Sequence, residues 1–218
     1  MNIKQVKALE ILDSRSNPTV MAITELEDGS IGTAAVPSGA STGSHEAVEL
    51  RDHDPKRFGG NGVLQAVSNV GLLSTLLAGK DAADQANVDN IMIDADGTEN
   101  KNHLGANALL AVSLSVARAE TVSEKLPLYR YLSKFNPDFR GQFTMPMPQM
   151  NVINGGKHGN WSTDIQEYMI IPVGAKKFSE ALRMGSEIYQ SLKSEIKAAG
   201  YAITVGDVGA HGARQPLH

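Results

Sequence analysis

The stretch VPSGASTGSHEA, residues 36–47, combines small hydroxyl side chains with two glycines. Gly39 and Gly43 flank Ser41 and Thr42. Because glycine has no Cβ and adopts unusual backbone angles, such a loop can lie very close to a ligand. Hydroxyl and carbonyl oxygens are also the hard ligands that suit Mg²⁺. The alternative is a plain surface connector. A phosphate-binding P-loop is excluded because its Lys-Ser/Thr pair is missing.

A second polar stretch, NVINGGKHGNWSTDIQEYMI at residues 151–170, has a different set of reactive side chains. His158 follows a double-glycine turn at the end of one expected strand, and Gln166 and Glu167 begin the next. The ends of strands are where α/β folds gather their sites, so these side chains could together bind a small polar substrate. The alternatives are a structural histidine and a surface glutamate. Further along, Asp207 in the GDVG stretch is either a ligand or a simple turn residue.

The elements that must position these residues follow from the hydrophobic periodicity. Alternating aliphatic residues predict three antiparallel strands before residue 37, with a hairpin turn at Asp28-Gly29 between the second and third. Helical spacing of aliphatic residues predicts two helices, the second apolar almost all round and therefore buried. The expected strands cover residues 3–11, 20–26 and 31–36, and the expected helices cover residues 66–77 and 104–116.

Composition changes between Lys134 and Pro148, where three prolines and a glycine lie close together, and this predicts a domain boundary. Beyond it we expect strands at 149–153, 168–172 and 202–205. A helix with one apolar face, from Phe178 to Ile196, should precede the last of them and end at Gly200. Two strands, a helix and a strand indicate the opening of an α/β layer rather than a closed unit.

Composition limits the possible functions. The 218 residues are 41% hydrophobic and carry a net charge of -4. Because the sequence contains no cysteine, disulfides and thiolate metal sites are impossible. Because no basic stripe stands out, we expect no nucleic-acid partner. The N-terminus does not have the pattern of a signal peptide. No run approaches the roughly 20 apolar residues of a membrane span.

The motifs together resemble the enolases, from about Ile3 to Gly209. The similar stretches are ALEILDSRSNPTV at 8–20, VPSGASTGSHEAVELRD at 36–52, NGGKHGN at 154–160 and DIQEYMIIPVGA at 164–175. The resemblance implies a small α+β N-terminal capping domain, residues 1–138. It further implies the first strands and helix of an incomplete α/β (TIM-like) barrel over residues 139–218, with a divergent tail from about 210.

The resemblance also implies a function, the Mg²⁺-dependent reversible dehydration of 2-phosphoglycerate to phosphoenolpyruvate in glycolysis and gluconeogenesis. Such a hydro-lyase is cytoplasmic and usually a homodimer. In the family, two Mg²⁺ ions hold the substrate carboxylate, a lysine takes the α-proton and a glutamate helps the hydroxyl to leave. Carried over by motif, Ser41 is a ligand of the second Mg²⁺, and Ala40, His158, Gln166 and Glu167 contact the substrate. His158 and Glu167 are the catalytic candidates among them.

The sequence departs from the family pattern in several places. Val208 stands where the family has the acidic glutamate, and valine cannot donate a proton. Ser16 stands where the family usually has glycine. The base lysine and the three carboxylate ligands of the first Mg²⁺ have no counterpart. We therefore expect a chain truncated within the barrel, by a frame change or an early stop, and impaired in catalysis. We also expect residues 1 to about 135 to fold alone, while the remainder is poorly stable or depends on a partner.

Two other functions stay open at the level of sequence. One is a non-catalytic binding or interaction protein that retains the capping domain. Its complex should survive Ser41→Ala and His158→Ala. The other is a different barrel lyase of the wider superfamily, and the SGASTG loop, residues 38–43, argues against it because that loop looks specific to enolases.

Overall fold

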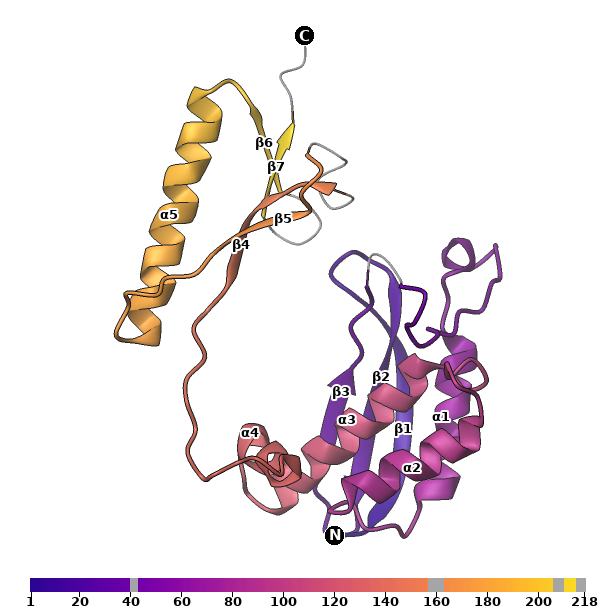
Figure 1. Ribbon diagram of the computed structural model, residues 1–218. Coiled ribbons are helices and arrows are strands. Elements are labelled where there is room, and N and C mark those ends of the chain that lie inside the picture. Colours follow the sequence, from indigo (N-terminus) through magenta and orange to yellow (C-terminus); the bar gives the residue numbers. More distant parts are fainter. Residues whose placement is uncertain (40–42, 157–162, 206–209, 215–218) are drawn as a thin grey trace. The chain divides into compact units, whose positions relative to one another are not determined.

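The computed structural model describes residues 1–39, 43–156, 163–205 and 210–214. The chain divides into two compact units, which we call the N-terminal unit (Met1–Phe139) and the C-terminal unit (Arg140–His218). Each has a β-sheet of its own, three-stranded in the first and four-stranded in the second, as labelled in Figure 1.

The N-terminal unit opens with a sheet of three antiparallel strands, β1 (Ile3–Leu12), β2 (Pro18–Leu26) and β3 (Ile31–Ala35), adjacent in that order. Alternate side chains of β2 are fully buried because successive strand residues face opposite sides of a sheet. The buried residues are Val20, Ala22, Thr24 and Leu26. The three expected strands are confirmed within two residues at each end.

The predicted hairpin turn between β2 and β3 is also confirmed. Gly29 has a φ of +85°, a backbone conformation that residues other than glycine rarely adopt. The Leu26 N–H donates to the Ser30 oxygen at 2.9 Å and closes the turn. The Asp28 carboxylate accepts the Ser30 N–H at 2.9 Å, so both residues of the Asp-Gly pair contribute to the turn.

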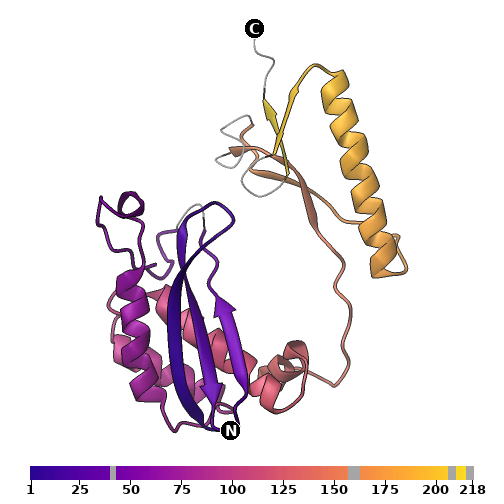
Figure 2. The ribbon, with the colours of Figure 1, turned by 180° about the vertical axis from the view of Figure 1, so that it is seen from behind.

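Three helices cover one side of this unit: α1 (Leu64–Leu77) and α3 (Ala106–Ser123) pack on the sheet, and α2 (Gln85–Asp96) packs on these two helices. Helix α3 contacts β2 and β3, and α1 contacts β1. Figure 2 shows the same unit from behind, with the strands in front of these helices. Both expected helices are confirmed, and α3 continues seven residues beyond the predicted end at Val116.

Close packing of α3 on the sheet depends on Gly32 of β3. A Cβ atom at this position would overlap with the main chain of Ser115 and Ala119. The absent side chain lets β3 and the helix backbone approach each other. One continuous apolar core results, built from β1, β2, all three helices and Val36 just after β3, and its described buried residues all lie between Ile3 and Ala119.

Short helices complete the N-terminal unit. A 3₁₀ turn, η1 (Phe58–Gly60), precedes α1, and α4 (Leu128–Leu132) continues into the 3₁₀ turn η2 (Ser133–Phe135). Residues 140–149 then form neither helix nor strand, consistent with their prolines.

The C-terminal unit contains an open sheet in the strand order β5-β4-β7-β6. Strand β4 (Met150–Asn154) pairs antiparallel with β5 (Glu167–Ile170) and parallel with β7 (His211–Arg214). Strand β6 (Ala202–Val205) pairs antiparallel with β7. The expected fold class is confirmed: an α+β unit is followed by barrel-type elements, which form no closed barrel in the described residues.

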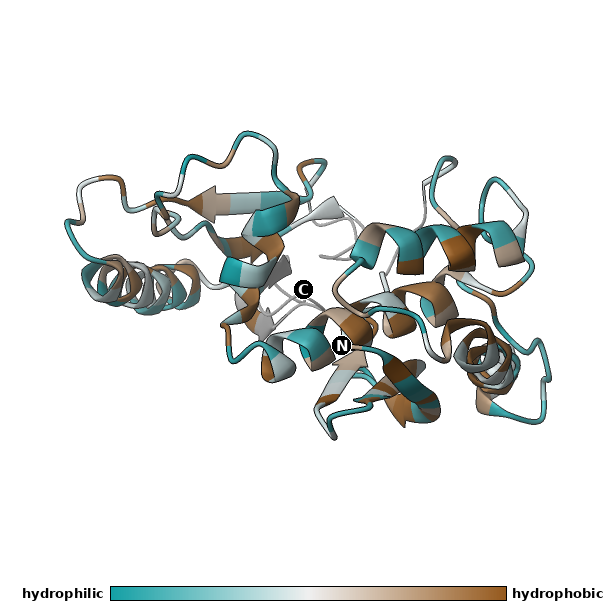
Figure 3. Ribbon diagram, turned by 90° about the horizontal axis from the view of Figure 1, so that it is seen from below, coloured by the Kyte–Doolittle hydropathy of each residue, from teal (hydrophilic) through white to brown (hydrophobic). Residues whose placement is uncertain are grey.

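One long helix, α5 (Phe178–Ala198), accompanies this sheet, and it ends as expected before Gly200, whose φ is +84°. Its predicted apolar face is only partly covered. Ala181, Gly185 and Ile196 are buried, whereas Phe178, Leu182 and Ile188 are 42–54% exposed. Figure 3 shows hydrophobic and hydrophilic bands alternating along the helices, as such an amphipathic pattern requires.

Candidate active site

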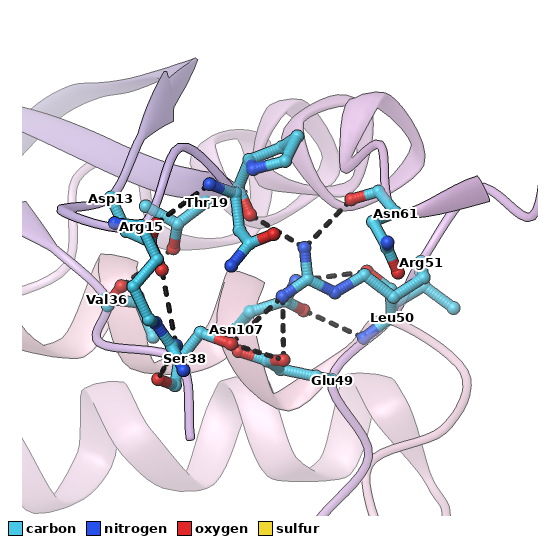
Figure 4. A network of polar contacts seen from close by, with 12 residues as sticks. Asp13, Arg15, Thr19, Val36, Ser38, Glu49, Leu50, Arg51, Asn61 and Asn107 are labelled. Atoms are coloured by element: carbon cyan, nitrogen blue, oxygen red, sulfur yellow. Dashed lines mark hydrogen bonds and ion pairs between the residues drawn. The ribbon is translucent and has the colours of Figure 1, made fainter. Parts of the chain in front are cut away.

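The glycine-rich loop after β3 begins from a firmly held stem. Thr19 Oγ1 donates to the buried Val36 oxygen at 2.7 Å, and Arg15 Nη2 donates to the Ser38 main-chain oxygen, also at 2.7 Å. Arg15 comes from the turn between β1 and β2, where Asp13 Oδ1 accepts the N–H groups of Arg15 and Asn17 at 2.8 Å each. Figure 4 shows how these contacts converge on the loop.

The same turn contains Ser16, one of the departures from the family pattern. Ser16 has a φ of +62°, in the left-handed region that favours glycine. Asp13 stabilises this turn by accepting two main-chain N–H groups, and those hydrogen bonds lower the pKa of its carboxyl, against an opposing effect of burial. The serine therefore occupies a position where glycine would be less strained.

Arg51 joins the far stem of the loop to the near one. Its Nη1 donates to the main-chain oxygens of Pro18 (2.6 Å) and Asn61 (2.8 Å). Its Nη2 donates to Ser38 Oγ at 3.1 Å and to the Glu49 carboxylate at 2.8 Å, and Ser38 Oγ donates to the same carboxylate at 3.1 Å. The planar guanidinium of Arg51 thus contacts four acceptors at once. Its side chain is only 14% exposed, so these contacts are partly shielded from water.

Asn107, in the first turn of α3, holds the residue just before Arg51. Its Oδ1 accepts the Leu50 N–H at 3.2 Å, and its Nδ2 donates to the Leu50 oxygen at 3.1 Å. Nearby, the Val48 oxygen accepts the Ala106 N–H at 2.8 Å. Gly105 makes room for this contact, since a Cβ atom there would lie 2.5 Å from Asn107 Oδ1. The far stem is thus fixed to the start of a buried helix.

These contacts bring the two ends of the loop together around Ser38, Glu49 and Arg51. The predicted metal ligand Ser41 and the predicted substrate contact Ala40 lie outside the described residues. Sequence reasoning singled out none of the charged or amide side chains that support the loop. The available signal was their charge and polarity inside the DSR and ELRD parts of the family motifs, next to a glycine-rich loop.

Asp52 extends the far stem to the start of α1. Its two carboxylate oxygens accept the N–H groups of Leu64 and Gln65, at 2.9 Å each, where the helix has unpaired donors. Arg57 lies between this carboxylate and Glu10 of β1, forming an ion pair with each. The hydrogen bond from Arg57 lowers the pKa of Glu10 most, and burial opposes it.

In the C-terminal unit the double-glycine turn packs directly on the segment that carries the other candidates. The Gly155 N–H donates to the Gln166 oxygen at 2.8 Å, and the Gly156 N–H donates to the Thr163 oxygen at 2.8 Å. Gly156 has a φ of +49°, and a Cβ at Gly155 would overlap with Thr163 and Ile165. Both glycines are therefore required by backbone geometry.

Glu167 begins β5 opposite Asn154, the last residue of β4. Its side chain is half-buried, and that of Gln166 is exposed. Asn154 is fully buried: its Oδ1 accepts from Asn151 at 2.6 Å, and its Nδ2 donates to the Ala210 oxygen at 3.3 Å. The structure thus places Gln166 and Glu167 beside the turn that precedes His158. His158 itself and Val208 lie outside the described residues.

A Mg²⁺ centre needs several oxygen ligands brought together in one place. Residues 1–39, 43–156, 163–205 and 210–214 contain no group of three or more His, Asp or Glu side chains that could hold a metal ion. These residues alone do not fit a Mg²⁺ centre, so no chemical step is derived through the metal. Over the same residues, no helix is long and apolar enough to cross a membrane.

Comparison with protein families covers both units. Residues 3–132 match the model of the enolase N-terminal domain, and residues 142–216 match that of the enolase C-terminal TIM barrel domain. The first match includes the loop stems with Arg15, Arg51 and Asn107. The second includes Gln166 and Glu167 and extends to residue 216, past Gly209, where we expected the resemblance to end. Because the first match alone spans more than half of the chain, the chain belongs to the enolase family.

Proposed function

We propose that the function of this chain derives from the enolase reaction, the reversible removal of water from 2-phosphoglycerate to give phosphoenolpyruvate in glycolysis and gluconeogenesis. The observation that supports the proposal is the loop of residues 36–52. Its two stems are joined through Ser38, Glu49 and Arg51 in a unit that matches the enolase N-terminal domain. We also propose the compartment and assembly that are usual in the family, the cytoplasm and a homo-oligomer.

The proposed roles follow the family motifs. Ala40, His158, Gln166 and Glu167 contact the substrate, and Glu167 supports the departing hydroxyl while His158 is the second catalytic candidate. Ser41 contributes to binding of Mg²⁺, which when bound supplies electrostatic stabilisation of the carboxylate. The main-chain contact between Gly155 and Gln166 supports these roles, because it holds the carbonyl of Gln166 against a turn that cannot accept a side chain.

We propose that the 218-residue chain assayed by itself turns over slowly or not at all. Val208 replaces the acidic group that assists hydroxide departure, and an aliphatic side chain neither donates a proton nor stabilises a charge. The test has two measurements on the purified chain with Mg²⁺: phosphoenolpyruvate formation by absorbance, and binding of 2-phosphoglycerate by calorimetry. We expect binding that weakens in Ser41→Ala and His158→Ala, with turnover far below that of an intact enzyme. Turnover at the level of intact enzymes would disprove the impairment, and absent binding would disprove the substrate assignment.

A non-catalytic interaction protein is the second candidate function. The observation that favours it is the continuous core of the N-terminal unit, whose described buried residues all lie between Ile3 and Ala119 and can support a folded module independently of catalysis. The discriminating experiment is a pull-down with the purified chain. A specific complex that persists in Ser41→Ala and His158→Ala would favour this function over 2-phosphoglycerate binding.

A further inference from the structure

His211, the first residue of β7, is a buried histidine. It is 1% exposed, and neither ring nitrogen has a hydrogen bond of good geometry within the described residues, although the main chain of Tyr189 interacts weakly with the ring. The ring stacks on Tyr189 of α5, with centroids 4.2 Å apart and planes inclined by 13°. Buried polar groups in folded proteins are normally paired with protein atoms, water or a ligand. The imidazole nitrogens therefore point to a missing partner.

A cleft of about 690 Å³ lies beside this histidine, bordered by the C-terminal half of α5 and by β6. Its lining includes Lys193 and Lys197, which are four residues apart and so occupy the same side of the helix. Ser194, Tyr189 and Tyr201 add hydroxyl groups. Among the described residues, no carboxylate lines the cleft. Two ammonium groups, an imidazole and several hydroxyls therefore border one space.

We propose that this cleft binds a phosphate monoester, with Lys193, Lys197 and His211 as its main contacts. A phosphate monoester carries a charge of about -1.5 to -2 at neutral pH, which matches the positive charges of the two lysines. Its tetrahedral oxygens can accept hydrogen bonds from several directions at once, whereas a planar carboxylate presents two oxygens in one plane. The described lining of the cleft includes none of the residues that support the proposed enolase function, so the inference does not depend on that function.

Burial and a neighbouring positive charge determine the electrostatic surroundings of His211. Burial lowers the pKa of His211, and the positive charge of Lys193 lowers it further, against a smaller opposing effect from the main chain of Tyr189. The charged and titratable groups around the cleft are Lys193, Lys197 and Tyr189 from α5 and Tyr201 before β6. A bound dianion would offset the lysine charge and favour the protonated imidazole. Binding should therefore raise the pKa of His211.

The experiment is a titration of the full chain with inorganic phosphate, and separately with phenyl phosphate as the monoester. Calorimetry measures affinity, and NMR of the imidazole signals follows the His211 pKa. We expect saturable binding, a raised His211 pKa in the complex, and affinity at least about tenfold weaker in the Lys193→Gln/Lys197→Gln double variant. His211→Phe keeps the stacked ring but removes the nitrogens, and it should weaken binding as well.

The matched control is Lys176→Gln/Lys177→Gln. It removes the same charge beside the other end of α5, at two exposed lysines outside the cleft. Circular dichroism of each variant establishes that the fold is retained, and His211→Gln provides a second replacement if His211→Phe does not fold. The proposal is overturned if the control pair weakens binding as much as the cleft pair, or if phosphate shifts no imidazole signal. Tighter binding of acetate than of either phosphate would also overturn it.

Discussion

Arg15 and Ser38 are joined by a hydrogen bond of 2.7 Å from the guanidinium Nη2 to the main-chain oxygen, across 23 residues of sequence. The bond connects the turn between β1 and β2 to the loop that carries the candidate chemistry. Asp13 fixes the same turn by accepting the N–H of Arg15 at 2.8 Å. The loop therefore starts from a position set by the sheet. Its far stem is set by Arg51 and α3.

Replacing Arg51 with lysine should destabilise the N-terminal unit by about 1–3 kcal/mol, because one ammonium group cannot reach four acceptors in a partly buried place. Urea unfolding measures the loss, and hydrogen exchange should accelerate at Ser38 and Glu49. The matched control is Arg118→Lys. Arg118 is exposed and donates to the Thr33 oxygen at 3.0 Å, so its replacement should change stability by less than about 0.5 kcal/mol. Equal effects of the two variants would contradict the joined-stem interpretation.

Gly32→Ala should be among the most damaging single-methyl changes in the chain. The new Cβ would overlap with main-chain atoms of Ser115 and Ala119, so β3 and α3 must separate at a cost of about 1–3 kcal/mol or more. Gly71→Ala provides the opposite case, because Gly71 lies within α1 with no atom within 4 Å of the added methyl. That variant should gain about 0.5–1 kcal/mol from helix propensity. Thermal unfolding of both variants should show a lower melting temperature for Gly32→Ala and a higher one for Gly71→Ala than for the unchanged chain.

The candidate site in the C-terminal unit gives a parallel prediction. Gly155→Ala should displace residues 163–166, because the methyl group would overlap with Thr163 Oγ1 and the Ile165 oxygen. NMR shifts of Gln166 and Glu167 should change, and 2-phosphoglycerate binding should weaken with them. Gly174→Ala is the control, with no atom within 4 Å of its added Cβ. Unchanged Gln166 signals in Gly155→Ala would show that the turn does not position this segment.

Regular periodicity was sufficient to predict most of the fold. The alternation along β2 and the apolar face of α3 both come from burial against one core, and burial leaves a direct trace in residue type. Helix α2 was not predicted, although Asp84 caps its start and Gly97 ends it in a left-handed conformation. Strand β7 was not predicted either, since its residues HGAR show no alternation. Pairing with β4 and β6 makes it a strand, so tertiary context decided its structure.

The candidate site was predictable only in part. Ser41, His158, Gln166 and Glu167 stood out because their residue types suit chemistry. The residues that position the loop did not, because Arg15, Arg51 and Asn107 come together only through the three-dimensional fold. Sequence spacing does not encode that proximity. A charged residue at a loop stem becomes a positioning residue only when the turn, the sheet and the helix place acceptors around it.

Acid should destabilise the N-terminal unit through Glu10. The hydrogen bond from Arg57 holds the folded-state pKa of Glu10 below its ordinary value of 4.5, against the opposing effect of burial. A carboxylate whose pKa is lowered by folding stabilises the folded state above the unfolded pKa, and this stabilisation is lost as pH falls through the folded pKa. The free energy of unfolding should therefore decrease below about pH 4.5. In Glu10→Gln that decrease should be smaller; an unchanged pH profile would exclude Glu10 as its source.

Limited proteolysis should separate the two units in a fixed order. The core of the N-terminal unit includes residues from Ile3 to Ala119, whereas the buried apolar residues described in the C-terminal unit are only Val152, Ala181, Ile196 and Ala210. Residues 140–149 have no helix or strand and are mostly exposed. Trypsin should therefore cleave first after position 139, while residues 1–139 persist as a fragment that unfolds cooperatively. Mass spectrometry identifies the first cuts, and uniform resistance along the chain, or early cuts between residues 64 and 123, would contradict this order. If the persisting fragment also retains the hydrogen-exchange protection of β2 and α3, the core of the N-terminal unit is sufficient for its own stability.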